Sequence, residues 1–246
     1  MRIFFFFLFI FTVSATVAQE EKSFSGSINL VEFSYGFSFS GGDMSDRFGG
    51  ISYINSGYSF LHKSNFLVEL KGGFLFGTNV KEDVLAELRK EEGLIIGNNG
   101  VDAIVFLRSR GIQLSMNVGK VITFRENSRS GIKLTAGVGF LQHWIRIQDD
   151  VNTLPQLDND YVFGYDRKTR GLSINQFIGY QVLANNQRLN FSAGVEFTQG
   201  FTKNIRTYNF GSAVDHSASR LDLLITPKIG IILSFYKFDS PDEIFY

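Results

Sequence analysis

The sequence predicts an all-β fold, an eight-stranded antiparallel up-and-down transmembrane β-barrel with short periplasmic turns and long outer loops. Three observations support this fold class: segments that alternate between apolar and polar residues, an N-terminus that looks like a secretory signal, and connections that alternate between short and long. Alternation with a period of two indicates strands with one apolar and one polar face. Many such strands behind a secretory signal are typical of outer-membrane barrels.

The clearest strand covers residues 188–201. From Leu189 to Phe201, every second residue is apolar except Gln199, and the residues between them are small or polar. Similar alternation predicts further strands over residues 29–40, 49–61, 65–77, 108–124, 131–147, 168–183 and 219–237. The facing of 49–61 stays open because its pattern is irregular. Phe177 interrupts the alternation of 168–183, which suggests a β-bulge.

A soluble barrel with its apolar face inward is the main alternative. Three features favour lipid on the outside of the barrel. The second face is rich in Gly and Ser, which suits a narrow lumen, and the strands are long enough to cross a bilayer. The third feature is that aromatic residues gather at both strand ends. Those near the short turns are Phe66, Phe124, Tyr180 and Phe235, and those near the long loops are Phe39, Phe76, Trp144 and Phe201.

The N-terminal residues 1–18 have the parts of a signal peptide, with Arg2 before an apolar run and small residues at Thr16 to Ala18. We therefore expect a single barrel domain over residues 19–246. Removal of Arg2 leaves 23 basic against 24 acidic residues, a balance that gives no reason to expect nucleic acid as a partner. The absence of cysteine excludes disulfides and thiolate metal sites.

The predicted short turns cover residues 62–64, 126–130 and 184–187, and the long connections cover 41–48, 78–107, 148–167 and 202–218. In the second long loop, Val84, Leu85 and Leu88 share one helical face and Gly93 is a suitable residue after a helix end. This spacing predicts a short exposed helix over 81–93. The apolar stretch 94–107 either extends the following strand or folds over the barrel mouth.

Charged residues on the predicted inward face are candidates for a polar network in the lumen. They are Glu32, Glu69, Lys71, Lys133, Glu196, Asp222 and Lys228. Glu196 and Lys228 fall at similar heights on neighbouring predicted strands. A charge in a narrow lumen is costly unless it is paired, so we expect a plug of ion pairs. The alternative is a gated pore in which the pairs rearrange.

Basic residues gather near the predicted outer strand ends. They are Arg108, Arg110, Arg146, Arg167, Lys168, Arg170, Lys203, Arg206 and Arg220. Arginine binds phosphate with paired, charge-assisted hydrogen bonds, which suggests contact with outer-membrane lipid or lipopolysaccharide. The alternative is pairing with nearby carboxylates, namely Asp149, Asp150, Asp158, Asp160 and Asp166.

Catalytic candidates are few. His62 and His216 fall in a turn and a loop, and His143 faces the lumen with Asp149 and Asp150 close in sequence. A catalytic site needs a nucleophile or water beside an oriented base, and no such spacing is visible. No His or carboxylate pair has metal-ligand spacing, so we expect no metal, no cofactor and no enzyme activity. A lipid-modifying enzyme that uses His143 is the alternative.

The chain resembles the small eight-stranded outer-membrane barrels, the class of the OmpA transmembrane domain and OmpX, over its whole mature length. The alternating run from Leu221 to Phe235 resembles the terminal strand of that class, although the chain continues to Tyr246. The segments GVGFLQHWIRI, GYDRKTRG and RLNFSAGVEF resemble barrels of bacteria that use type IX secretion. The resemblance implies an integral outer-membrane protein with a structural or interaction role, with other envelope proteins as further partners, or a narrow pore or transport protein as the alternative.

Overall fold

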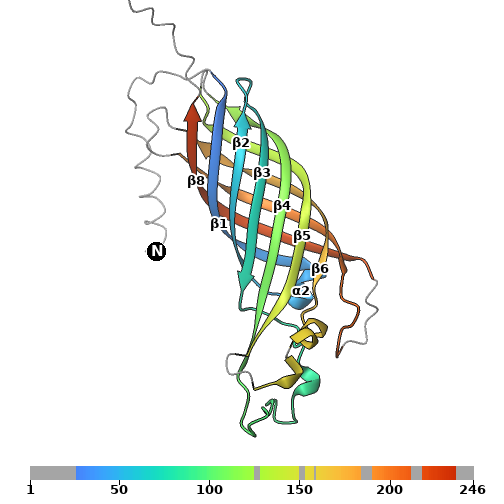
Figure 1. Ribbon diagram of the computed structural model, residues 1–246. Helices are drawn as coiled ribbons and strands as arrows, with labels where there is room; N and C mark the ends of the chain where they lie inside the picture. Colours follow the sequence, from blue (N-terminus) through green and yellow to red (C-terminus); the bar gives the residue numbers. More distant parts are fainter. Residues whose placement is uncertain are drawn as a thin grey trace, which may run out of the picture.

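The computed structural model describes residues 26–124, 128–149, 153–157, 159–183, 190–211 and 218–236. In this part of the chain, eight antiparallel strands form a closed barrel in which each strand pairs with its neighbour in sequence and the last pairs with the first (Figure 1). The strands are β1 (Ile28–Gly42), β2 (Ile51–Leu61), β3 (Phe66–Gly77), β4 (Val105–Thr123), β5 (Gly131–Asp149), β6 (Thr169–Val182), β7 (Phe191–Asn204) and β8 (Arg220–Tyr236). The predicted fold class is confirmed, while the predicted signal peptide, 1–18, lies outside the described residues.

The strand bounds differ from the predicted ranges by at most three residues at either end. The sequence left open which residues of β2 face outward. The structure shows that Ile54 and Tyr58 face outward while Tyr53 is buried inside. The predicted bulge at Phe177 is wrong. Phe177 pairs in regular register with Thr135 on one side and Glu196 on the other, so it is an apolar residue at an inward position.

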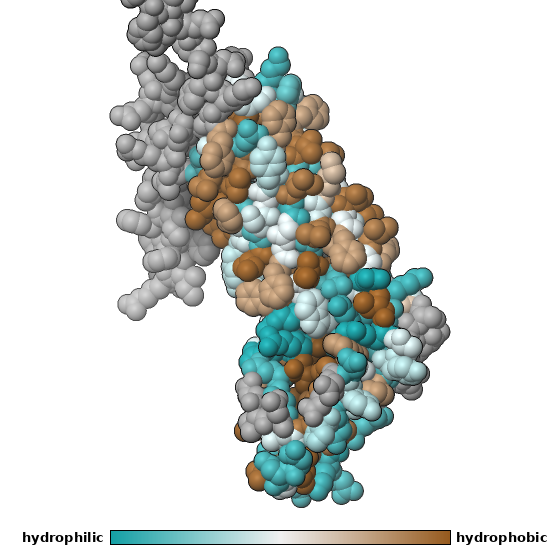
Figure 2. Space-filling view, in the orientation of Figure 1, coloured by the Kyte–Doolittle hydropathy of each residue, from teal (hydrophilic) through white to brown (hydrophobic). Residues whose placement is uncertain are grey.

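The barrel exterior is apolar and uncovered. Outward side chains such as Val138, Leu172 and Ile231 keep 67%, 75% and 67% of their surface exposed. Figure 2 shows brown, hydrophobic residues gathered over the barrel and mostly teal, hydrophilic ones over the loop end. Because a continuous apolar exterior is unfavourable in water, this surface is suited to hydrocarbon. None of the helices in the described segments is long and apolar enough to span a membrane.

The connections divide the barrel into a short-turn end and a loop end. The short-turn end carries the connection 62–65, in which Asn65 adopts a left-handed φ of 63°, and the β4–β5 and β6–β7 connections. The predicted turn 184–187 and residues 126 and 127 lie outside the described residues. The loop end carries α2 (Met44–Arg47) and three 3-10 turns, η2 (Ala86–Leu88), η3 (Pro155–Leu157) and η4 (Asn159–Gly164).

The predicted helix over 81–93 is wrong, because the only helical part that the structure describes there is the three-residue turn η2. Val84 and Leu85 are nevertheless buried, so tertiary contacts rather than helix formation cover these apolar side chains. Both alternatives for the stretch 94–107 hold in part. Val105 begins β4, and Ile95 folds back to pack over the barrel mouth.

The barrel interior has three layers. The short-turn layer is an apolar cluster of Ile28, Leu30, Leu61, Leu67, Val121, Leu183 and Ile232. The middle holds buried polar and charged residues. The loop-end layer is a second apolar cluster of strand and loop residues, which includes Met44, Phe48, Ile51, Tyr53, Leu75, Val84, Leu85, Ile95, Leu141, Ile145, Leu154, Tyr165 and Leu224. Apolar clusters therefore occupy inward positions at both ends of the barrel, so the inward face is not small and polar throughout as the sequence suggested.

We expect an arginine in the middle of the lipid face to destabilise the barrel much more than one at its edge. Leu114→Arg lies mid-strand on β4 and should cost about 2–4 kcal/mol, whereas Leu221→Arg, at the loop end of β8, should cost about 0–1 kcal/mol. Urea-induced unfolding in lipid vesicles measures both. Equal costs would contradict a hydrocarbon-facing exterior.

Candidate functional site

Six charged side chains form one continuous ion-paired chain across the lumen, which we call the lumen chain. Its members, in order of contact, are Glu32, Lys133, Glu69, Lys71, Glu196 and Lys228. The Nζ to carboxylate-oxygen distances are 3.1, 2.7, 3.5, 2.9 and 2.7 Å along the chain. Three ammonium groups face three carboxylates, so the lumen chain is electrically balanced.

The lumen chain is removed from water, because each of its residues keeps 7% or less of its surface exposed. Taking a charge out of water costs several kcal/mol, and each ion requires partners to offset that cost. The contacts connect strands that lie far apart around the barrel, since Lys133 on β5 reaches Glu32 on β1 and Glu69 on β3. The network therefore ties opposite walls of the barrel together.

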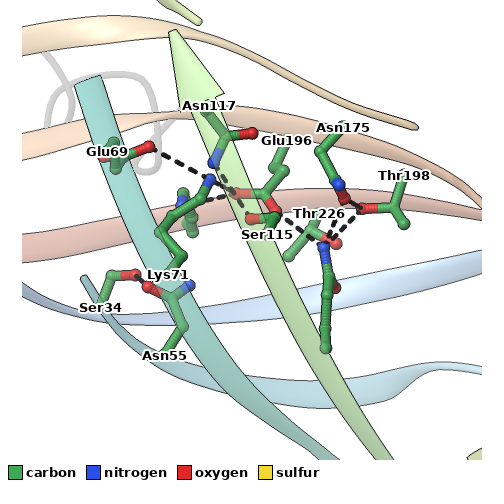
Figure 3. A network of polar contacts seen from close by, with 12 residues as sticks. Ser34, Asn55, Glu69, Lys71, Ser115, Asn117, Asn175, Glu196, Thr198 and Thr226 are labelled. Carbon is green, nitrogen blue, oxygen red and sulfur yellow. Dashed lines mark hydrogen bonds and ion pairs between the residues drawn. The ribbon is translucent and has the colours of Figure 1, made fainter. Parts of the chain in front are cut away.

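Neutral side chains complete the shell around the carboxylates. Gln113 donates from Nε2 to Glu196 Oε1 at 3.2 Å and to Asn175 Oδ1 at 2.6 Å. Ser192 donates to Glu32 at 2.9 Å, and Ser59 donates to Glu69 at 3.2 Å. Figure 3 shows the labelled side chains of this network meeting from different strands, with Lys71 between two carboxylates. The carboxylate oxygens are thus satisfied by neutral donors as well as by ammonium groups.

Phe177 fills the lumen beside two of the ammonium groups. The Nζ atoms of Lys228 and Lys133 lie 4.9 and 5.7 Å from its ring centroid, within the range of a cation–π contact. Gly179 and Gly194 leave room for the ring, because a Cβ at either position would lie 2.6 or 2.7 Å from its Cζ atom. Sequence reasoning missed this role, since an inward aromatic looks like a break in the alternation.

Asp222, the seventh predicted lumen residue, does not join the lumen chain. It lies nearer the loop end, where its Oδ2 contacts His143 Nε2 at 2.8 Å. Thr202 also donates to Asp222, and Thr169 Oγ1 lies 2.8 Å from the same His143 nitrogen. His143 therefore pairs with Asp222, which is distant in sequence. Of its two acidic neighbours in sequence, Asp149 accepts from the backbone N–H groups of Thr153 and Leu154, and Asp150 lies outside the described residues.

The His143 cluster does not have the geometry of a nucleophile and its base. A relay requires the carboxylate and the nucleophile on different ring nitrogens, but Asp222 and Thr169 both make their closest approach to Nε2. His143 is 1% exposed and lies under Phe48, whose ring packs edge-on at 5.5 Å. Within the described residues, no group of three or more His, Asp and Glu could hold a metal ion.

Glu82 ties loops together above the barrel mouth. Its two carboxylate oxygens bind Arg47 Nε at 2.9 Å and Arg167 Nε at 2.8 Å. Arg167 also donates to the carbonyl oxygens of Gly164 and Phe210, so all four loop-end connections meet at this point. Burial is the main cause that lowers the pKa of Arg47 below its ordinary value, and Glu82 acts against this shift. Sequence reasoning missed this contact because its members are far apart in the chain.

Six of the nine predicted basic residues form one outward surface at the loop end of β4 to β7, which we call the cationic face. They are Arg108, Arg110, Arg146, Lys168, Arg170 and Lys203. Arg108 pairs in register with Arg146, and Arg170 with Lys203. Lys168 packs over the Trp144 ring at 5.5 Å. Among the described residues, none of the six has a carboxylate oxygen within 4.0 Å.

The other three predicted basic residues point into the loop assembly. Arg167 is 3% exposed and binds Glu82, and Arg206 pairs with Asp166. Arg220 donates to the carbonyl oxygen of Asp43. Pairing with one of the five predicted aspartates, the alternative for the whole set, thus applies to Arg206 and Asp166. Arg167 and Arg220 have other carboxylate partners, Glu82 at 2.8 Å and Asp222 at 3.7 Å. Asp150 and Asp158 lie outside the described residues.

The cationic face is the main charge on the barrel exterior. Along the outward positions of the described strands there is no Asp or Glu, and the one further cation is Lys120 at the short-turn end. Lys120 packs over Phe66 at 5.1 Å. The barrel exterior therefore carries uncompensated positive charge at the loop end of β4 to β7, which favours an anionic binding partner.

These features define a transmembrane β-barrel with an ion-paired interior and a cationic face at one end. No family model matches the chain, and no curated protein matches it. Among solved structures, it is similar to Neisserial surface protein A, with 7% identity over 85% of this chain and 99% of that chain and a TM-score of 0.45. Ail of Yersinia pestis shows 9% identity over 84% and 98%, with a TM-score of 0.42.

The N-terminal β-barrel domain of OprF from Pseudomonas aeruginosa is similar at 8% identity over 84% of this chain and 97% of that chain, with a TM-score of 0.38. At such low similarity these likenesses carry no argument about function. The fold rests on the strand pairing described above, and the expected link to type IX secretion stays a prediction.

We expect Glu196→Gln to destabilise the barrel by about 3–5 kcal/mol, because it leaves the ammonium groups of Lys71 and Lys228 without their shared carboxylate. Urea unfolding followed by the fluorescence of Trp144, the single tryptophan, measures the loss. The double variant Glu196→Gln with Lys228→Met should recover part of it. No recovery, or a loss below about 1 kcal/mol, would contradict a coupled lumen chain.

Proposed function

We propose that the protein is an integral outer-membrane barrel with a closed lumen, which presents an ordered loop assembly at the cell surface and binds phosphorylated glycolipid through its cationic face. Its role is structural or interactive within the cell envelope, alone or in a larger outer-membrane complex. The observation that carries the closed lumen is the balanced lumen chain enclosed between two apolar layers.

Both layers place apolar side chains across the path that a pore through the lumen would follow. Water or an ion would have to pass Leu61 and Leu67 at the short-turn end and Tyr53, Leu75 and Leu141 at the loop end, all 2% exposed or less. Eight strands enclose just enough room for side chains. Opening would have to break the buried ion pairs of the lumen chain, and a charge that stays in the lumen without its partner costs several kcal/mol. A narrow pore, the alternative function, would need all these elements to move.

The cationic face supports an anionic lipid partner. Its cations lie at one strand end, directly beyond the apolar band, at the level where headgroups meet the hydrocarbon. Arg108 is held by Gln148, which accepts from its Nε at 2.6 Å and leaves the terminal nitrogens available. Arginine binds phosphate with two parallel hydrogen bonds. Phosphorylated glycolipid of the lipopolysaccharide type is the anionic lipid expected beside such a barrel in the outer leaflet.

In planar bilayers, we expect purified protein to show no steady open-channel current, because the lumen chain and both apolar layers block the path. Insertion is verified by protease digestion of the exposed loops in the same membranes. A steady current on the nanosiemens scale (an order-of-magnitude expectation for a water-filled barrel) would contradict the closed lumen.

The triple variant Arg108→Gln, Arg146→Gln, Arg170→Gln should bind lipid A about a hundredfold more weakly, because each cation near a lipid surface contributes about 1 kcal/mol. Lipid A that co-purifies in mild detergent is quantified by mass spectrometry. The matched control carries the same change in charge outside the cationic face, at Lys63, Lys90 and Lys120. Unchanged lipid A in the first variant, or equal losses in both, would contradict lipid binding by this face.

A further inference from the structure

A pair of amide side chains lies on the lipid-facing surface in the middle of the barrel wall. Gln176 on β6 and Gln199 on β7 both occupy outward positions, and Gln199 Nε2 donates to Gln176 Oε1 at 3.2 Å. Gln176 is six residues from Arg170 at the loop end and four from Tyr180 at the short-turn end. The pair is therefore placed deep in the apolar band.

One hydrogen bond does not satisfy the two amides. A glutamine side chain has two donor hydrogens and one acceptor oxygen. Among the described residues, no further hydrogen bond reaches the amide nitrogen of Gln176 or the carbonyl oxygen of Gln199. Hydrocarbon offers no replacement, so each unmet group costs free energy in the bilayer. An outside group with both donor and acceptor atoms would remove this cost.

A recess lies directly beside Gln176. Its volume is about 430 Å³, and its lining includes Ala136, Leu134, Ile178 and Phe197. Ala136 pairs in register with Gln176 and is the smallest outward residue of β5. Small residues next to a polar group let another membrane-embedded surface approach closely, as at interfaces between transmembrane segments.

We propose that this surface, Ala136, Gln176 and Gln199, is the contact between two copies of the chain that stand side by side in the membrane. The argument for a second copy is complementarity: a two-fold axis along the membrane normal places the same amides opposite one another at the same depth. The unmet amide hydrogens of Gln176 in one copy then face the unmet carbonyl oxygen of Gln199 in the other. The contact is isologous, so the same hydrogen bond forms in both directions at once.

The cationic face works against this pairing. Arg170 and Lys203 lie on the same two strands nearer the loop end, so two facing copies bring like charges together. Anionic headgroups between the copies offset that repulsion. The dimer is therefore tested in vesicles that contain phosphatidylglycerol, at a high ratio of lipid to protein so that random encounters are rare.

The absence of cysteine allows a site-specific test. Ala136→Cys places a thiol in the contact, and Ser56→Cys places one at an exposed outward position of β2, outside the contact. With a short bis-maleimide cross-linker, we expect the Ala136→Cys protein to give covalent dimers and the Ser56→Cys protein to remain monomeric. In labelled protein, energy transfer across a lipid-dilution series measures the dissociation constant.

Gln176→Leu with Gln199→Leu should weaken dimerisation about tenfold, which corresponds to about 1.4 kcal/mol, because the amide contacts are lost while the apolar contacts remain. Ser56→Leu is the control substitution and should leave the constant unchanged. The proposal is overturned if the two cysteine variants cross-link equally, if neither forms dimers, or if the double leucine variant dimerises as the unchanged protein does.

Discussion

The structure depends on the balance of charge among side chains that are buried in the lumen. Eight strands enclose a space that side chains must fill, and a charge placed there is tolerated only with a partner. The lumen chain meets this requirement with three carboxylates and three ammonium groups, and neutral donors such as Gln113 complete their coordination. Because these contacts cross the barrel, they hold walls together that share no backbone hydrogen bonds.

The same arrangement connects the barrel to its loops. Above the lumen chain, Leu75 and Leu141 form an apolar base on which loop residues such as Leu85 pack. Glu82 then joins Arg47 and Arg167 across the top of that layer. The loops are therefore positioned by a buried apolar cluster and by the two ion pairs of Glu82. The membrane-facing exterior contributes a second surface, where cations and amides gather on β4 to β7.

Alternation along each strand was sufficient to predict the barrel, because one face of each strand contacts lipid and the other lines the lumen. It could not predict how inward apolar residues near the strand ends are buried. Leu75 and Leu141, for example, are covered by loops that are distant in sequence. The helix expected over 81–93 failed for the same reason: burial of Val84 and Leu85 against the barrel outweighed the helical spacing. The ion pairs of Glu82 link loops far apart in the chain, and no local pattern indicates them. The sequence indicated the inward charges and the similar heights of Glu196 and Lys228, which form an ion pair at 2.7 Å. It did not indicate the ion pairs that cross the lumen between distant strands, such as that of Lys133 with Glu32.

The central claim is that outward side chains contact hydrocarbon while inward ones are closed off from both lipid and water. Single cysteines at Leu70, Leu114 and Ile229 (outward) and at Ser115, Ser173 and Ser192 (inward) test it directly in detergent-free vesicles. We predict that a fluorophore at the outward sites is quenched by spin-labelled acyl chains, and that a water-soluble maleimide labels the thiols of neither set in the folded protein. Rapid labelling of the outward sites, with no quenching by lipid, would contradict the account.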